Sequence, residues 1–222
     1  MIKAILFDLD NTLIDFFRFK KNSCDAAINA MILAGLKINK KKATRILFEL
    51  YDRYGIEYPR IFQKFLMKVN KKIDYKILTH GIMAYRKMKE NFMTPYPGTI
   101  ETLKKLKKKY KLAIISDAPG INAWMRLIAM NIDTYFDVVL TKSDIKAQKP
   151  SSKIFMRVIS LLKVKPSECI MIGDRIERDI SGANALGIKT VFKKYGHKQT
   201  KYSGANFEIK KINELPKIIK KL

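Results

Sequence analysis

The sequence is short of acidic residues and of cysteine. Its 222 residues include 20 Asp and Glu against 45 Lys and Arg, which gives a formal net charge of +25, and only two cysteines. Cys24 and Cys169 lie far apart, with no CxxC pair or Cys/His cluster beside either of them. This spacing is not that of a zinc site or of a disulfide framework, so we expect two buried free thiols.

Long hydrophobic runs are also missing. No apolar stretch approaches the roughly 18 to 20 residues that a membrane-spanning helix needs. Met1 leads directly into a strand-like segment, without the charged start and apolar stretch of a signal peptide. We therefore expect a cytoplasmic protein without a membrane partner.

The positive charge raises the question of a nucleic-acid partner, because basic surfaces attract phosphate backbones. The lysines, however, are spread along the whole chain, and none of the usual nucleic-acid-binding motifs is present. We therefore do not expect a dedicated nucleic-acid partner. A positive field that attracts a small anionic substrate is compatible with the same composition.

Short apolar runs rich in Ile and Val alternate with helical patterns at the start of the chain and after residue 95. Strands that alternate with helices in this way predict a parallel sheet flanked by helices, with right-handed crossovers. The fold class is therefore α/β with a Rossmann-like sheet. The expected strands are residues 2–7, 112–115, 138–140, 170–172 and 190–192, with an edge strand at 207–209 and a closing basic helix at 213–222.

Residues 16–93 break this alternation. Their apolar residues recur at spacings of three and four, which is typical of amphipathic helices. The expected helices are residues 23–33, 41–53, 58–69 and 75–89. We therefore predict that 1–15 and 94–222 form an α/β core and that 16–93 form an inserted all-α domain.

Polar residues follow four of the predicted strands. Ligands of open α/β sheets bind beyond the carboxyl ends of the strands, so these residues are candidates for one common site. The set is Asp8, Asp10, Ser116, Asp117, Lys149, Asp174 and Asp179. Each of them alone is an ordinary helix cap, turn former or surface residue.

Several aspartates at one sheet edge would repel one another, because ionised carboxylates leave water only at a cost of several kcal/mol unless a positive group compensates them. Mg²⁺ suits a site with few carboxylates, several waters and a phosphate. We therefore expect a bound Mg²⁺ ion beside Asp8, Asp10 and Asp174.

The strand-end segments resemble the four signature segments of the haloacid dehalogenase-like (HAD) hydrolase superfamily. Asp8-Leu9-Asp10-Asn11-Thr12 resembles the DxDxT pattern, Ser116 the second segment, Lys149-Pro150 the third, and Gly173-Asp174 with Asp179 the fourth. The resemblance covers the α/β parts at both ends of the chain. It implies the phosphatase branch, because Asp10 and Thr12 favour phosphate chemistry, and it implies that 16–93 are the helical cap at the family's first insertion position.

The resemblance also implies residue roles. Asp8 is expected to be the nucleophile, and Asp10 the acid and then the base. The Mg²⁺ ligands would be the Asp8 carboxylate, the Asp10 backbone carbonyl and Asp174, supported by Asp179 and Thr12. Ser116 and Lys149, with the backbone at Asp117, would bind the phosphoryl oxygens. Asp117 is a departure, since many relatives carry Asn there and the change adds a negative charge beside the phosphate.

The expected function is Mg²⁺-dependent hydrolysis of a small phosphomonoester through an aspartyl-phosphate intermediate. The alternatives are a phosphotransferase or sugar-phosphate mutase with the same core, or a non-catalytic nucleic-acid-binding protein. The sequence names neither the substrate nor the oligomeric state. Arg18 and Lys20, in an aromatic and basic stretch at the entry to 16–93, are either hinge packing or contacts to an anionic substrate.

Overall fold

The computed structural model describes residues 1–194 and 203–222. The chain forms two compact units, one made of Met1–Asp15 with Thr94–Leu222 and the other of Phe16–Met93. A cluster of buried apolar side chains lies within each of them.

The first unit contains a parallel β-sheet. Among the described residues, each pair of neighbouring strands is parallel, and the strand order is β3-β2-β1-β4-β5-β6. The strands are β1 (Ala4–Phe7), β2 (Lys111–Ser116), β3 (Val138–Thr141), β4 (Cys169–Gly173), β5 (Lys189–Lys193) and β6 (Phe207–Ile209). The predicted α/β class and the predicted edge strand at 207–209 are confirmed.

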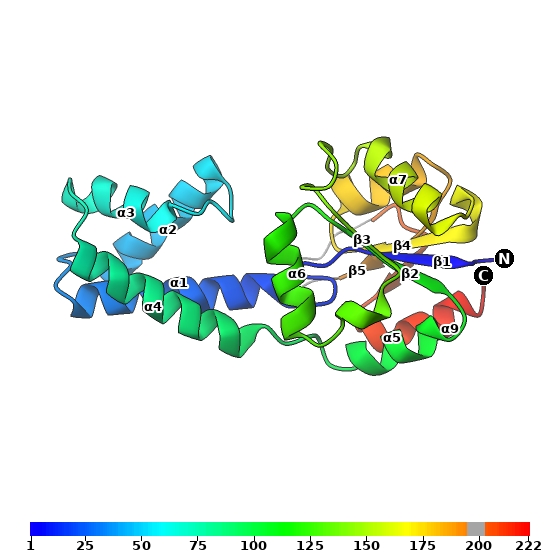
Figure 1. Cartoon of the computed structure of the whole chain (residues 1–222), viewed down its shortest axis with the longest axis horizontal. Coiled ribbons are helices and arrows are strands. Elements are labelled where there is room, and N and C mark those ends of the chain that lie inside the picture. The colour runs from blue at the N-terminus through cyan, green and yellow to red at the C-terminus, as the bar shows by residue number, and fades with distance from the viewer. Residues whose placement is uncertain (195–202) are drawn as a thin grey trace. The chain divides into compact units, whose positions relative to one another are not determined.

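Helices cover this sheet on both faces. Figure 1 shows α5 (Thr99–Lys107) and α9 (Leu215–Ile219) on one face and α7 (Ser152–Leu162) on the other. The remaining helical segments of this unit are α6 (Gly120–Ala129), the π-helix η3 (Ile176–Ile180), α8 (Ser181–Asn184) and the 3-10 turns η1 (Asp133–Tyr135), η2 (Pro166–Glu168) and η4 (Ile212–Glu214). Because both faces are covered, β1 and β4 are buried along their whole length, which explains their uninterrupted apolar sequences.

The order in which strands are added to the sheet reverses between β1 and β4, two central strands. From β1 the chain continues to β2 and β3 on one side, and β4, β5 and β6 lie on the other side. The neighbours β1 and β4 therefore flank the topological switch point, where the crevice of an open α/β sheet lies.

The closing helix is shorter than predicted. Residues 213–222 were expected to form one helix, but the structure has the turn η4 followed by α9. The Glu214 carboxylate accepts the backbone N–H of Lys211 at 2.7 Å, which favours a tight turn at this point. Pro216 then lies in the first turn of α9, where its missing N–H costs no hydrogen bond.

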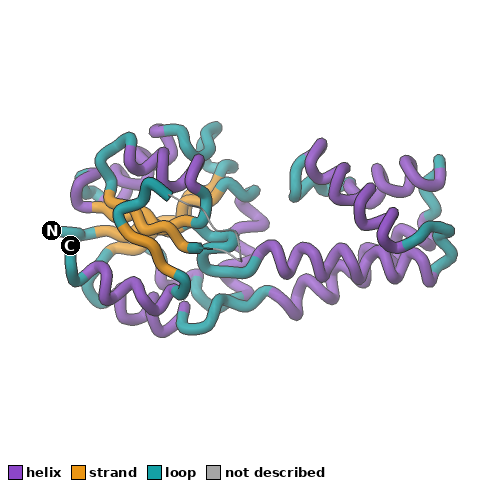
Figure 2. The backbone as a smooth tube through the Cα atoms, turned by 180° about the vertical axis from the view of Figure 1, so that it is seen from behind, coloured by secondary structure: helices purple, strands orange, loops and turns teal. Residues whose placement is uncertain are grey.

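The second unit contains four α-helices. They are α1 (Phe16–Leu33), α2 (Lys40–Tyr54), α3 (Ile61–Asn70) and α4 (Tyr75–Phe92), and Figure 2 shows α1 and α4 as the two long helices. Asn39 accepts the N–H of Lys41 at 2.9 Å and so caps α2, while Asp74 accepts the N–H of Ile77 at 3.0 Å and caps α4.

Helix α1 begins seven residues earlier than predicted. The stretch expected to be a hinge, Phe16 to Lys20, forms the first turns of α1, because Phe16 and Phe19 continue its buried face. The Arg18 guanidinium lies 5.8 Å from the centre of the Phe92 ring, and Lys20 Nζ donates to Tyr85 Oη at 2.9 Å. Both cations therefore pack within the helical unit.

Two further expectations concern the cysteines and membrane-spanning segments. Cys24 and Cys169 are both buried and free, as predicted. In residues 1–194 and 203–222, no helix is long and apolar enough to cross a membrane.

Candidate active site

The loop after β1 begins the site. The sheet pairing of β1 ends at Phe7, and the chain turns at Asn11, whose φ of 61° lies in the left-handed region. Between these points Asp10 forms an isolated bridge with Ile14. The carboxylates of Asp8 and Asp10 contact different cations.

The Asp8 carboxylate is held from both sides. Its Oδ1 lies 2.5 Å from Lys149 Nζ, and its Oδ2 accepts the Thr12 hydroxyl at 2.9 Å. Asp8 is 7% exposed and Thr12 is fully buried. Two fixed donors on a buried carboxylate restrict its rotation, so the group is oriented before any substrate binds.

Lys149 connects three elements of the site. Besides Asp8, its Nζ contacts Asp179 Oδ1 at 2.7 Å and donates to the carbonyl of Ile115, at the end of β2, at 2.9 Å. Burial alone would lower the pKa of Lys149, but Asp179 and Asp8 raise it above its ordinary value. The side chain is therefore a permanent cation at this edge of the sheet.

Asp179 is part of η3, and its side chain is completely buried. Its Oδ2 accepts the backbone N–H of Arg175 at 3.0 Å, so Lys149 and this amide contact one oxygen each. Burial raises the pKa of Asp179 to about 6, against the opposing charge of Lys149. Gly173 permits this position, because a Cβ there would lie 2.4 Å from the Asp179 side chain.

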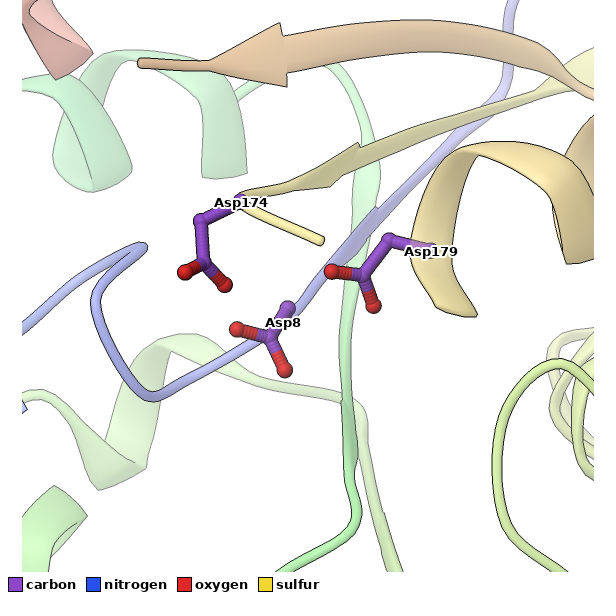
Figure 3. Close-up of side chains that lie close together, drawn as sticks. All are labelled: Asp8, Asp174 and Asp179. Carbon is purple, nitrogen blue, oxygen red and sulfur yellow. The ribbon is translucent and has the colours of Figure 1, made fainter. Parts of the chain in front are cut away.

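Asp174 follows β4 and completes a cluster with Asp8 and Asp179. One carboxylate oxygen from each lies within 4.8 Å of the others, and Figure 3 shows the carboxyl groups of Asp174 and Asp179 directed toward Asp8. Burial, followed by the charges of Asp8 and Asp179, raises the pKa of Asp174 to about 8. Within the described ranges, its carboxylate has no hydrogen-bond or salt-bridge partner.

This cluster fits a hard divalent cation. Lys149 contacts Asp8 and Asp179, whereas Asp174 lies partly buried beside the charges of these two carboxylates. Carboxylate oxygens at this separation are the ligands that Mg²⁺ or a similar ion prefers. The side chain of Asp10 is not among the three clustered carboxylates.

Ser116 is the last residue of β2, and Asp117 follows it. Ser116 is buried, and its Oγ accepts the N–H of Ala118 at 3.2 Å, which leaves its own proton available to a ligand. Asp117 Oδ1 accepts the N–H of Lys149 at 2.9 Å, and its Oδ2 lies 3.4 Å from Arg178. The unusual aspartate therefore connects the loop of Lys149 to η3, and its charge is shared with Arg178.

Asp10 contacts a residue that the sequence interpretation did not select. Arg126, on α6, places its Nη1 3.1 Å from Asp10 Oδ2, and the arginine side chain is only 2% exposed. The sequence contained a signal, because Arg126 lies between Ala123 and Leu127 on the otherwise apolar face of an amphipathic helix. A charged residue at such a position needs a buried partner.

Lys193, at the end of β5, was also missed. Its Nζ donates to the carbonyl of Asn11 at 3.2 Å and lies 3.8 Å from the centre of the Tyr96 ring. Burial lowers its pKa to about 8, while Asp174 and Asp15 oppose this shift. It follows a predicted strand, so the strand-end rule that selected Asp174 applies to it equally.

Several known proteins are similar to this chain along its whole length. The family model described as haloacid dehalogenase-like hydrolase matches residues 5–193. A glyceraldehyde 3-phosphate phosphatase of Pyrococcus furiosus is 35% identical over 227 residues, covering 100% of this chain and 93% of the relative. The protein of the same name from Methanocaldococcus jannaschii is 36% identical, with 100% and 99% covered.

A solved structure agrees with these matches. The crystal structure of a HAD phosphatase from Thermococcus onnurineus has a TM-score of 0.73 to this chain at 29% identity, with 98% of each chain covered. The residues matched by the family model include strands β2 to β5 and the aspartates Asp8, Asp174 and Asp179. This chain therefore belongs to the haloacid dehalogenase-like hydrolase family.

Proposed function

We propose that this chain is a Mg²⁺-dependent phosphatase that hydrolyses a small phosphomonoester through an aspartyl-phosphate on Asp8. The observation that carries the proposal is the Asp8 carboxylate itself, which is buried, fixed by Lys149 and Thr12, and adjacent to Asp174. A carboxylate held in this way is arranged to attack an electrophile, since its orientation is determined before substrate binding.

In the first step, an oxygen of Asp8 attacks phosphorus while the bond between phosphorus and the ester oxygen breaks. Asp10 gives a proton to the departing oxygen, so an alcohol leaves and an acyl phosphate remains on Asp8. The Asp10 side chain is 25% exposed, which permits contact with a substrate oxygen or a water.

In the second step, Asp10 takes a proton from a water, and the water oxygen attacks phosphorus. The acyl-phosphate bond to Asp8 breaks, inorganic phosphate leaves, and the carboxylate of Asp8 is restored.

The positive groups of the site would bind the phosphoryl oxygens. Lys149 Nζ is already beside Asp8, and the Ser116 hydroxyl lies at the end of the neighbouring strand β2. Both would stabilise the charge that develops on the phosphoryl group in the transition state. Asp117 contributes by holding the backbone of Lys149.

Asp8 and Asp174 would hold the Mg²⁺ ion, with the backbone carbonyl of Asp10 as the third protein ligand expected from the family resemblance. When bound, the ion supplies positive charge to the phosphoryl oxygens and to these two carboxylates. Asp179 would support them from behind, because each of its oxygens already contacts a donor.

We further propose a three-carbon phosphomonoester as the substrate. Relatives that are 35% and 36% identical over the whole of this chain are named glyceraldehyde 3-phosphate phosphatases. The role of Phe16–Met93 as a cap that determines this choice stays a prediction.

The experiment measures release of inorganic phosphate from glyceraldehyde 3-phosphate, phosphoglycolate and 4-nitrophenyl phosphate, with Mg²⁺ or with EDTA. We expect turnover with Mg²⁺ only, fastest on the triose phosphate. Asp8→Asn should lose at least about 1,000-fold in kcat because it removes the nucleophile.

Asp52→Asn, on the exposed surface of α2, is the matched control and should retain full activity. Turnover in EDTA, or full activity of Asp8→Asn, would contradict the mechanism. An isomerised sugar phosphate formed without free phosphate would instead identify a mutase.

A further inference from the structure

The contact between Arg126 and Asp10 has no place in the signature segments that identified the site. Asp10 Oδ2 lies 3.1 Å from Arg126 Nη1, and the two residues are separated by 116 positions in the chain. The guanidinium side chain is 2% exposed, whereas the carboxylate side chain is 25% exposed. The arginine is therefore enclosed by the protein, whereas the aspartate is partly exposed to solvent.

The contact requires the charge of Arg126 to be buried, which costs free energy. Helix α6 presents Ala123, Arg126 and Leu127 as its buried residues, so a full positive charge lies on a face that otherwise packs against apolar atoms. A buried guanidinium without a carboxylate partner is strongly destabilising. Asp10 supplies a partner, and the stiff, planar guanidinium restricts the rotation of the carboxylate in return.

We propose that Arg126 is a positioning residue for Asp10, holding its carboxyl group beside the ester oxygen that leaves phosphorus. This inference rests on the proposed function, since it assigns a role in the proton transfer of that reaction. Arg126 acts through Asp10 and is not a catalytic residue itself.

The chemistry of the first step makes this role measurable. Asp10 reacts in its protonated form: as the bond between phosphorus and the ester oxygen breaks, its proton moves to that oxygen, and the carboxylate that results is paired with Arg126. A basic leaving group needs this proton, whereas an electron-poor phenol leaves as a stable anion and needs it much less. Poor positioning of Asp10 should therefore slow esters of basic alcohols most.

The test compares phenyl phosphate with 4-nitrophenyl phosphate, which are similar in size but differ in leaving group. We expect Arg126→Met to reduce kcat/KM about 100-fold for phenyl phosphate and about tenfold or less for 4-nitrophenyl phosphate, from the size of general-acid contributions. Arg126→Lys keeps the charge on a shorter side chain and should recover part of the loss, with the same dependence on leaving group.

A double-mutant cycle with Asp10→Asn separates positioning from general damage. If Arg126 acts through Asp10, the Asp10→Asn, Arg126→Met double variant should be no more than about threefold slower than Asp10→Asn alone. If the two losses multiply, Arg126 acts independently of Asp10 and the proposal is overturned.

Arg157→Met, on the exposed side of α7, is the control for loss of an arginine charge and should match the wild-type protein on both esters. Thermal unfolding of each variant shows whether it is folded. If Arg126→Met does not fold, the comparison of the two esters is made with Arg126→Lys instead. Equal losses on both esters would overturn this inference while the wild-type activity upholds the proposed function. Absence of phosphate release from the wild-type protein would refute the proposed function itself.

Discussion

Asp174 illustrates, at the scale of a single residue, how a cluster of like charges costs stability. Its carboxylate shares a small, partly buried space with Asp8 and Asp179, and burial and these charges raise its pKa to about 8. Because the folded chain binds this proton more tightly than the unfolded chain does, the free energy of unfolding falls as the pH rises from about 4 to 8. The protein retains the residue although it opposes folding at neutral pH, which is typical of a functional position.

Asp174→Asn should therefore stabilise the metal-free protein at pH 8. We expect a gain of about 1 kcal/mol in the free energy of unfolding in EDTA, within the ordinary range of single substitutions, shrinking toward zero near pH 4. Added Mg²⁺ should stabilise the wild-type protein and leave the variant unchanged, because only the wild type retains the ligand.

Urea unfolding at pH 4, 6 and 8, with EDTA or Mg²⁺, measures these differences. Asp52→Asn should follow the wild-type curve in both conditions, since Asp52 is exposed on α2. A variant that is less stable than the wild type at pH 8 in EDTA would show that Asp174 stabilises the fold by a contact other than a bound ion.

At the scale of secondary-structure elements, the sequence patterns placed most helices and strands correctly and missed their ends. The core of each strand was visible as an apolar run, but β2 and β5 extend to the polar residues Ser116 and Lys193. The start of α1 was missed because the aromatic and basic stretch Phe16 to Lys20 has the composition of a hinge or a substrate contact as well as of a helix. Which of these it forms depends on packing partners such as Tyr85, and no local pattern identifies those.

Close packing between α1 and α4 is a second feature that the spacing of apolar residues did not show. Gly81 of α4 faces Met31 of α1, and a Cβ at Gly81 would lie 2.1 Å from Met31 Cε. Glycine costs about 1 kcal/mol of helix propensity at such a position. Its presence therefore reflects the space that the Met31 side chain occupies.

Gly81→Leu should destabilise the helical unit by about 1–3 kcal/mol through overpacking, although leucine is the better helix former. Thermal or urea unfolding monitored by circular dichroism measures the loss. In a Met31→Ala background the same change should cost less, because the missing methionine leaves room for the leucine. Equal costs in the two backgrounds would mean that Met31 is not the obstacle.

At the scale of the whole molecule, the chain divides into two compact units, and each contains one cysteine. Cys24 lies in the core of the helical unit, and Cys169 lies on β4 in the core of the α/β unit. Burial raises the pKa of Cys24 to about 11 and that of Cys169 to about 12. Both thiols are therefore protonated and inaccessible in the folded protein, and each reports the opening of its own unit.

Neither thiol should react with Ellman's reagent at pH 8 in the absence of denaturant, and both should react when the chain is unfolded. If the units unfold independently, labelling at increasing urea, read by mass spectrometry of the separated peptides, should expose the two cysteines at different midpoints. Serine variants of each cysteine identify the signals. Fast labelling of either thiol in the native protein would contradict its burial.

The sequence by itself determined the fold class and selected the principal candidate site residues. Strand and helix periods are local properties, and the rule that ligands lie beyond the carboxyl ends of parallel strands converts a strand end into a candidate residue. Asp8, Ser116, Lys149 and Asp174 were all predicted in this way, and the structure brings Asp8, Lys149 and Asp174 together.

Only the tertiary structure decided which cation is paired with which carboxylate. Lys149 reaches Asp8 across 141 residues of sequence and Arg126 reaches Asp10 across 116. The energy of a pair of charges depends on the distance between them and on their burial, and both arise from packing. The patterns thus selected the candidate carboxylates, whereas the contact of Arg126 with Asp10 depends on how α6 packs against the loop after β1.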